Sequence, residues 1–413
     1  MEFAAKTPDD RQARRYARLC QKTQAEYEQE RKLLQARPDY LDAYSYFLDL
    51  VSKPFQVSEV AKRVGKPVTG LYCIQAPLEL FLALELHPVR LCGGSQAVQQ
   101  MAAANLPVLM CPMLKSFMGN FSLYQNQMQD FKGMVLPTTC DWIAKLPEIM
   151  GIDSKSVHYM ELPHVKDTEK SQKRWLEEVY DLKHYLEKLA GSKLNPKNLA
   201  RSIQQAGRVW SLLKKLEKLK AGGVLSEVWF LLITNSFLAD APERWLEETE
   251  KVLQALQGKK ANENLYKVFV AGSPIFFPNF KLPELIEQAG MQVAADDLCS
   301  SERILPGGIV YDDTSEYGML RALSDRYHKA CICPTFTENE RRINNILNAA
   351  EDYQIKGVVY NLLKGCHPYD IEAITIEQKL KEQGLKFIKI ETDYGREDSQ
   401  NILTRLEAFR QTL

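Results

Sequence analysis

Cysteines are the residues of this sequence whose chemistry is most distinctive. The chain has nine, and only Cys331 and Cys333 stand close together, so the Cys-x-x-Cys spacing of many zinc and ferredoxin motifs is absent. Thiolates bind zinc and iron–sulfur clusters, whereas a buried free cysteine often serves only as a small apolar residue. Spacing alone leaves open a zinc site, an iron–sulfur site and a set of buried thiols without metal.

Seven cysteines share one position relative to the predicted elements. Each lies at or just past the carboxyl end of a short extended segment, before a helix. Open parallel sheets bind their ligands at this edge, so thiols from two domains could converge on one cleft. The dipoles of the following helices would lower the pKa values of the thiols and favour an anionic cluster. This placement favours a metal or cluster site formed by Cys73, Cys111, Cys140, Cys299, Cys331, Cys333 and Cys366.

The elements that must position these thiols form an α/β pattern. Short apolar runs alternate with helical stretches from about residue 66, which predicts parallel sheets. In the first half we expect strands at 68–73, 89–91, 108–110, 134–136 and 157–161. In the second half we expect them at 266–271, 291–295, 357–362 and 386–390. Long amphipathic helices are predicted at 175–189 and 199–219, the second preceded by Asn195-Pro196.

The length of 413 residues favours more than one domain. We expect two Rossmann/flavodoxin-like domains with parallel sheets, an N-terminal helical cap and a helical linker region. The predicted boundaries are 1–60 for the cap, 61–220 for the first α/β domain with long helices at its end, and 221–413 for the second. The cluster would lie in the cleft between the two α/β domains.

Composition excludes several classes of partner. The chain has 53 basic and 53 acidic residues, so no net field favours nucleic acid or an anionic membrane. No secretory signal is visible at the start, and no apolar run approaches the roughly 20 residues of a membrane span. We therefore expect a cytoplasmic protein that binds neither nucleic acid nor membranes.

Several short motifs, in order, resemble the small-subunit family of 2-hydroxyacyl-CoA dehydratases and benzoyl-CoA reductases. Together they span roughly 66–395. The first four are LYCIQAPLE at 71–79, PVRLC at 88–92, CPMLKS at 111–116 and TTCD at 138–141. The others are GVVY at 357–360, CHPY at 366–369 and IETDY at 390–394.

The resemblance implies a ligand set for one [4Fe–4S] cluster. Ordinary dehydratase subunits of the family hold such a cluster with three cysteines, and the matching positions are Cys111, Cys140 and Cys366. Cys20 lies in the predicted helical cap and is expected to take no part.

The remaining cysteines resemble the double-cubane branch of the family, in which two cubanes share a bridging sulfide as an [8Fe–9S] cluster. Six thiolates are needed there, and Cys73, Cys299 and the Cys331/Cys333 pair supply the additional ones. The sequence leaves open which member of that pair binds and whether Cys92 takes part.

Four other residues are candidates near the cluster. His367 follows Cys366 and could donate a hydrogen bond or a proton, and Glu391 at the end of the last strand could reach into the cleft. Lys115 and Ser116 could donate hydrogen bonds to cluster sulfurs, or could simply form a solvated helix start.

The function that follows from the resemblance is low-potential reduction of a small molecule. The chain has no P-loop and no Gly-x-Gly-x-x-Gly after a strand. The resemblance therefore implies an ATP-hydrolysing activator protein with its own [4Fe–4S] cluster, a homodimer and an anaerobic host. One alternative is the [4Fe–4S] subunit of a 2-hydroxyacyl-CoA dehydratase, a lyase that would pair with a related subunit. The other is a non-redox thiol or zinc binding protein.

Overall fold

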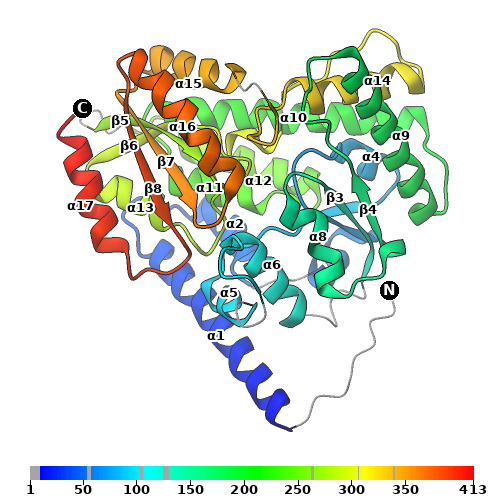
Figure 1. Cartoon of the computed structure of the whole chain (residues 1–413), viewed down its shortest axis with the longest axis horizontal. Helices are drawn as coiled ribbons and strands as arrows, with labels where there is room; N and C mark the ends of the chain where they lie inside the picture. The colour runs from blue at the N-terminus through cyan, green and yellow to red at the C-terminus, as the bar shows by residue number, and fades with distance from the viewer. Residues whose placement is uncertain are drawn as a thin grey trace.

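The computed structural model describes residues 10–53, 57–102, 106–123, 130–261, 265–305, 307–337 and 340–413. Two parallel sheets lie side by side, each wrapped by helices, and helices from the middle of the chain run between them (Figure 1). The predicted architecture of two Rossmann-like α/β units with additional helical regions is confirmed.

The first sheet has four parallel strands in the order β2-β1-β3-β4. They are β1 (Val68–Leu71), β2 (His87–Arg90), β3 (Phe131–Pro137) and β4 (Val157–Met160). All residues of the inner strand β1 are buried, as expected for a parallel sheet covered on both faces. The helices between these strands are α4 (Leu78–Ala83), α5 (Gln96–Ala102), α6 (Pro112–Leu123) and α8 (Asp141–Met150), and the 3₁₀ turn η3 (Ser154–Ser156) precedes β4.

The second sheet repeats this plan in the order β6-β5-β7-β8, again all parallel. Its strands are β5 (Tyr266–Gly272), β6 (Met291–Asp296), β7 (Gly357–Leu363) and β8 (Lys386–Thr392). The inner strand β7 is buried along its whole length. The elements between and after these strands include α13 (Lys281–Gln288), η4 (Glu302–Ile304), α15 (Glu340–Tyr353), α16 (His367–Glu382) and α17 (Ser399–Arg410).

Long helices connect the two sheets. The second of them, α10 (Pro196–Ala221), begins where the sequence predicts. The Asn195 side chain accepts a hydrogen bond from the N–H of Lys197, and Pro196 occupies the first turn. The first, α9 (Glu169–Ala190), is capped by Thr168 at its start and by Gly191 at its end. The φ of +68° at Gly191 suits a glycine. The connecting helices are α9 (Glu169–Ala190), α10 (Pro196–Ala221), α11 (Glu227–Ser236) and α12 (Pro242–Ala255).

Helix α14 (Glu316–Lys329) belongs to the second half of the sequence but packs against α9. A buried ion pair attaches it to α4, with 2.5 Å between Arg326 Nη1 and Glu79 Oε1. The hydroxyl of Tyr327 donates to the other oxygen of Glu79 at 2.9 Å. The segment that follows α14 is thereby held next to the first sheet.

The N-terminal helices α1 (Asp10–Gln35), α2 (Ser45–Val51) and α3 (Val57–Val64) contact both halves of the molecule. In the loop before α2, the short 3₁₀ turn η1 (Asp42–Tyr44) stacks the Tyr44 ring on Trp229 of α11, with 4.4 Å between ring centroids. Glu26 of α1 accepts a hydrogen bond from the backbone N–H of Gln96 at the start of α5, at 2.7 Å. Helix α1 then extends away from the sheets (Figure 1).

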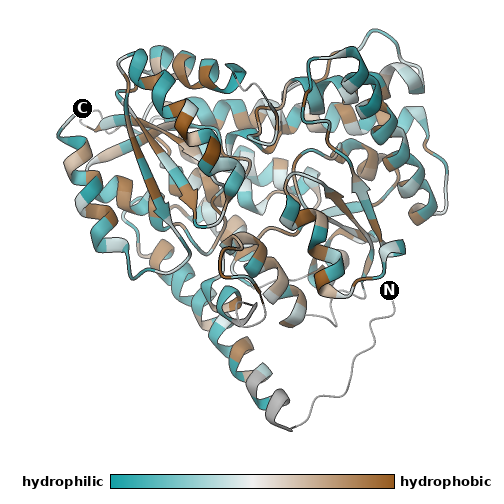
Figure 2. Ribbon diagram, viewed as in Figure 1, coloured by the Kyte–Doolittle hydropathy of each residue, from teal (hydrophilic) through white to brown (hydrophobic). Residues whose placement is uncertain are grey.

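Apolar residues gather on the strands and on the inner faces of the helices, and polar residues lie on the outer faces (Figure 2). The two sheets and the connecting helices share extended apolar cores. Among the described residues, no helix combines the length and apolar character required to cross a bilayer.

One predicted strand, 108–110, is wrong. The segment before Cys111 is a turn in which the N–H of Met110 donates to the carbonyl of Pro107 at 3.0 Å. Val108 is 89% exposed and Leu109 is 67% exposed, so the apolar run does not mark a buried strand. Cys111 therefore stands at the start of a helix without a preceding strand.

Candidate functional site

Three cysteines stand directly before the first residue of a helix. Cys111 precedes α6, Cys140 precedes α8 and Cys366 precedes α16. At each of them, backbone N–H groups of the following turn hydrogen-bond the sulfur. The last two follow the inner strands β3 and β7, so the carboxyl edges of both sheets contribute to the site.

These three thiols interact electrostatically and form thiol group 1. Cys111 and Cys140 both act on Cys366, although more than 220 residues separate it from either of them in the sequence. Thiols from the two sheet units thus lie near one another in thiol group 1.

Four further cysteines form thiol group 2. Cys73 follows β1, Cys299 follows β6, and Cys331 and Cys333 lie in the segment after α14. Cys73 interacts electrostatically with the other three, and both Cys331 and Cys333 interact with Cys299. The packing of α14 on the first half is what brings its following segment to Cys73.

The backbone at Cys73 has a φ of +123°, a region that residues with a side chain rarely adopt. Such conformations persist where the surrounding structure imposes them, and they are concentrated at functional sites. The strained backbone indicates that the position of this thiol is fixed by the fold.

The remaining two cysteines differ in their surroundings. Cys92, after β2, interacts with Cys299 of thiol group 2 and with the guanidinium of Arg90. Cys20 lies on α1 beside Tyr16 and interacts with none of the other thiols in the described part of the chain. Cys92 therefore borders the site, whereas Cys20 lies outside it. No disulfide joins any of the nine cysteines, all of which are in described segments.

The predicted lowering of the thiol pKa values is wrong. Burial raises the pKa of Cys111 to about 12, although the N–H groups of α6 and the Lys115 charge act in the opposite direction. Burial and the nearby thiol of Cys331 raise the pKa of Cys333 to about 12. The helix starts do favour thiolate, as expected, but desolvation is the larger effect.

Two buried hydrogen-bond donors face the thiols without a partner. The hydroxyl of Tyr72 is buried, has no hydrogen-bond partner among the described residues, and interacts electrostatically with Cys111, Cys140 and Cys92. Arg303 donates from Nη2 to the Tyr369 hydroxyl at 3.0 Å, while its Nη1 is equally unpartnered. Buried donors of this kind normally find an acceptor.

Two more side chains surround thiol group 2. Gln75 Nε2 donates to Cys331 Sγ at 2.9 Å. The ammonium of Lys166, which is 2% exposed, donates to the Cys331 carbonyl and lies 5.0 Å from the centre of the Phe336 ring. Lys166 and Arg303 thus place two positive charges beside thiol group 2, which favours a bound anionic centre.

Lys115 and Ser116 are both buried, so the interpretation as a solvated helix start is excluded. Lys115 Nζ donates to the Val108 carbonyl at 2.8 Å and interacts electrostatically with Cys111. Ser116 Oγ instead accepts a hydrogen bond from the N–H of Ser95, at 3.2 Å. The structure thus places Lys115 beside thiol group 1 and directs Ser116 toward α5.

His367 and Glu391 are both exposed, in different surroundings. His367 is the first residue of α16 and, with Cys140, lines a cavity of about 850 Å³. Trp142, Thr335 and Ile371 also border this cavity. Glu391 is on β8, where it pairs with Leu362 of β7, and its carboxylate interacts electrostatically with Lys364.

The donor set fits an iron–sulfur cluster. No three Cys, His, Asp or Glu side chains of the described residues are grouped so that they could hold a single metal ion. Each thiolate of a cubane binds a different iron, so cluster ligands stand further apart than the ligands of one ion. The two thiol groups, with unpartnered donors beside each, match the needs of anionic clusters whose sulfurs accept hydrogen bonds.

The roles of four of these residues were not predicted from the sequence. Tyr72 and Gln75 flank Cys73, and this adjacency is the signal that could have identified them. Lys166 and Arg303 carry no such signal, because they reach the thiols only through the packing of α14 and the turn after β6.

Comparison with known proteins identifies the family. The model of the 2-hydroxyglutaryl-CoA dehydratase, D-component family matches residues 73–413. The chain belongs to this family. The match begins at Cys73, directly after β1, and extends over all the other strands of both sheets, so all seven cysteines of the two thiol groups lie within it.

Relatives within the dehydratase family align over nearly their full length. The putative dehydratase subunit YjiM of Escherichia coli is 27% identical over 366 residues, covering 85% of this chain and 93% of the relative. The (R)-phenyllactyl-CoA dehydratase beta subunit of Clostridium sporogenes is 20% identical over 381 residues, 90% of this chain and 98% of that subunit. The beta subunit of (R)-2-hydroxyglutaryl-CoA dehydratase from Acidaminococcus fermentans is 21% identical over 373 residues, which cover 85% of this chain and 94% of that subunit. These relatives support a dehydratase-type subunit.

Proposed function

We propose that this chain is a low-potential iron–sulfur reductase of small molecules that holds a double-cubane [8Fe–9S] cluster. Thiol group 1 would bind one cubane. Cys73, Cys299 and one member of the Cys331/Cys333 pair would bind the other. The observation that carries the proposal is the presence of a second thiol group in addition to the first, because a single [4Fe–4S] cluster does not require it.

When bound, such a cluster stores single electrons and passes them on at low potential. The residues of this chain set the conditions for that chemistry. Tyr72, Gln75 and Arg303 can donate hydrogen bonds to sulfur, and the cations of Lys166 and Arg303 offset negative charge. Cys111 and Cys331 are buried and the other five thiols are half-buried, so the fold shields the centre from water in part.

The proposal includes an ATP-hydrolysing activator with its own [4Fe–4S] cluster, since this chain has no P-loop of its own. Four exposed apolar side chains lie on the two segments that carry Cys111 and Cys366, which supports docking of a protein beside thiol group 1. They are Val108 (89% exposed), Leu109 (67%), Ile371 (70%) and Ile374 (68%). A homodimer is proposed as well, on the resemblance described above.

The alternative is a 2-hydroxyacyl-CoA dehydratase subunit, and the names of the relatives favour it. Such a subunit would hold one cubane on thiol group 1 and would pair with a related second subunit. The cavity of about 850 Å³ beside Cys140 and His367 has room for part of a thioester substrate. In this case thiol group 2 would be metal-free.

Iron and acid-labile sulfide in the anaerobically purified full chain distinguish these proposals. About eight irons and nine sulfides per chain are expected for the double cubane. About four irons would support the dehydratase subunit and would contradict the double cubane. A colourless preparation with no iron would overturn both and leave the zinc or metal-free thiol protein.

A further inference from the structure

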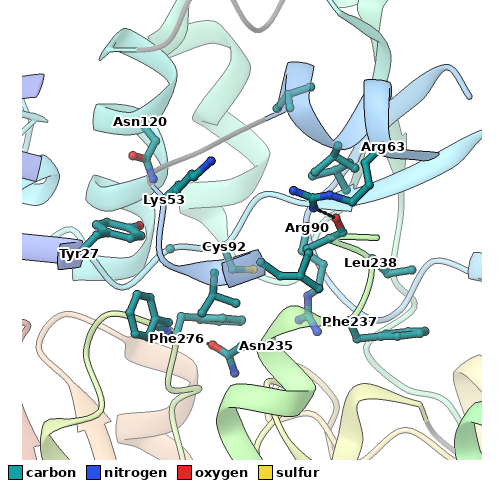
Figure 3. Close-up of a pocket in the computed structure, with 18 residues that line it drawn as sticks. Tyr27, Lys53, Arg63, Arg90, Cys92, Asn120, Asn235, Phe237, Leu238 and Phe276 are labelled. Carbon is teal, nitrogen blue, oxygen red and sulfur yellow. Dashed lines mark hydrogen bonds between the residues drawn. The ribbon is translucent and has the colours of Figure 1, made fainter. Parts of the chain in front are cut away.

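A small cavity separates the N-terminal helices from the edge of the first sheet (Figure 3). Its volume is about 130 Å³. A cavity of roughly 150 Å³ holds one benzene molecule, so this one suits a ligand of about six non-hydrogen atoms or fewer. A coenzyme A thioester is far too large for it.

The charged groups at this cavity are all cationic. Among the described residues, its lining includes Lys53, Arg63 and Arg90 and no carboxylate. Lys53 is half exposed and pairs with Glu59 at 3.2 Å. Neither guanidinium forms an ion pair with a carboxylate among the described residues, since Arg63 donates to the Ala239 carbonyl at 2.7 Å and Arg90 to the Cys299 carbonyl at 3.1 Å. Neither positive charge is therefore neutralised by a carboxylate of the described residues, although Arg90 also hydrogen-bonds the Cys92 thiol.

Asn120 provides a second, independent indication of a ligand. It lines the cavity, is 3% exposed, and its Oδ1 has no hydrogen-bond partner among the described residues. A buried amide oxygen without a partner is unfavourable. Rotation of the amide would present its N–H₂ group instead, so this side chain can serve either a hydroxyl or an oxygen of a ligand.

The cavity adjoins the thiols. In Figure 3, Cys92 lies between Asn120 and Arg90. Arg90 interacts with the Cys92 thiol, reaches Cys299 of thiol group 2 through its hydrogen bond, and lies 5.4 Å from the centre of the Phe276 ring. A ligand held by Arg90 is thus one side chain away from the proposed cluster.

We propose that this cavity binds a small carboxylate of about six or fewer non-hydrogen atoms, held by Arg63 and Arg90 and oriented by the Asn120 amide. Its role as the substrate class of the reductase rests on the proposed function, whereas binding of the anion does not. The N-terminal helices would then complete a binding site in addition to covering the sheet.

Acetate and formate are suitable probes, titrated by calorimetry into the anaerobically purified full chain at constant ionic strength. We expect saturable binding that weakens at least about tenfold in Arg90→Gln and in Asn120→Asp, because a lost or added charge at this distance changes affinity by that order. Arg201→Gln, which alters a guanidinium lining a different surface cavity, is the matched control and should bind as the unaltered chain does. Melting temperatures would identify any variant that fails to fold.

Electron paramagnetic resonance of the reduced protein, recorded with and without acetate, tests the role of the ligand. A spectral change that Arg90→Gln abolishes would support a substrate site beside the cluster. Absence of saturable binding, or equal binding by Arg90→Gln and the unaltered chain, overturns the inference even if the iron content supports the cluster. Binding that depends on Arg90 in a preparation without iron supports the anion site while the reductase proposal fails.

Discussion

Gln75 Nε2 donates a hydrogen bond of 2.9 Å to the Sγ of Cys331, a residue 256 positions further along the chain. Gln75 is 1% exposed and Cys331 is 5% exposed, so no water competes for this contact. The bond ties the segment after α14 to the turn that carries Cys73. If Cys331 is the member of its pair that binds the proposed cluster, this bond also reaches a ligand sulfur, which the first of the following experiments tests.

Gln75→Leu should lower the reduction potential of the bound cluster. One neutral hydrogen bond is worth about 1 kcal/mol, which corresponds to about 40 mV for a one-electron couple. Redox titration followed by electron paramagnetic resonance measures the shift. Gln378→Leu, on the exposed face of α16, is the control and should leave the potential unchanged. An unchanged potential in Gln75→Leu would show that Cys331 is not the ligand.

Arg303→Met should produce a larger negative shift at unchanged iron content. The guanidinium is anchored by Asp297 and Tyr369, so its free Nη1 is directed by the fold and carries a charge as well as a hydrogen bond. Hydrogen bonds from charged donors are worth about 1.5–3 kcal/mol, so the shift in potential should be about 1.5 to 3 times that of Gln75→Leu. Arg303→Lys should restore part of the shift. Loss of iron in Arg303→Met would instead assign this residue to cluster retention.

Serine substitutions test the division of the thiols into two groups. Cys366→Ser should remove about half of the iron, and Cys73→Ser should remove the other half, because each change deprives one cubane of a ligand. Cys20→Ser is the matched control, since this thiol lies apart on α1. If Cys20→Ser removed iron and Cys366→Ser did not, the ligand assignment would be wrong.

Glu79→Gln should destabilise the chain by about 3–5 kcal/mol, the cost of leaving one partner of a buried ion pair uncompensated. Arg326 would lose its partner at 2.5 Å while remaining buried. Urea unfolding of the metal-free chain measures the effect. The control Glu377→Gln breaks an exposed pair with Lys381 and should change stability by less than about 0.5 kcal/mol.

Glu187 should make the stability of the chain depend on pH in the acid range. Burial alone would raise its pKa, but the N–H of Leu194 and the ammonium groups of Lys193 and Lys183 lower it to about 2. The folded-state pKa lies below the ordinary value of 4.5. Ionised Glu187 therefore adds to the free energy of unfolding above pH 4.5, and this contribution is lost as the pH falls toward 2.

Urea unfolding between pH 7 and pH 3 compares Glu187→Gln with the unaltered chain. The difference in midpoint should be largest at pH 7 and should shrink as the acid range is entered. Glu382→Gln is the surface control, because the carboxylate of Glu382 is exposed and pairs with Lys379 at 3.1 Å. A difference that stays constant across this range would contradict the assigned pKa.

Much of the fold could be predicted from the sequence because its local signals agree with each other. Buried inner strands such as β7 read as continuous apolar runs, and the Asn195-Pro196 start of α10 acts through its own side chain and ring. The segment 108–110 has the same apolar character, but nothing in its composition shows that Val108 lies at the surface. Only the arrangement of neighbouring strands decides that question.

Residue type and position could predict the placement of some of the thiols, but not their surroundings. Cys73, Cys140, Cys299 and Cys366 follow parallel strands, whereas Cys111 has no strand before it and Cys331 and Cys333 follow α14. Lys166 and Arg303 reach thiol group 2 through packing that no local pattern encodes. The predicted effect on thiol pKa was wrong for a related reason, since the depth of burial is set by the whole fold.

Both thiol groups take members from chain segments on opposite sides of the molecule. In thiol group 1, Cys366 follows β7 of the second sheet, whereas Cys111 and Cys140 belong to the first half. In thiol group 2, Cys299 follows β6 of the second sheet, whereas Cys73 follows β1 of the first. A bending motion that separated the sheets would pull both groups apart at once. On the proposed assignment, bound clusters would cross-link the two halves through their thiolates, in addition to the apolar core that the halves already share.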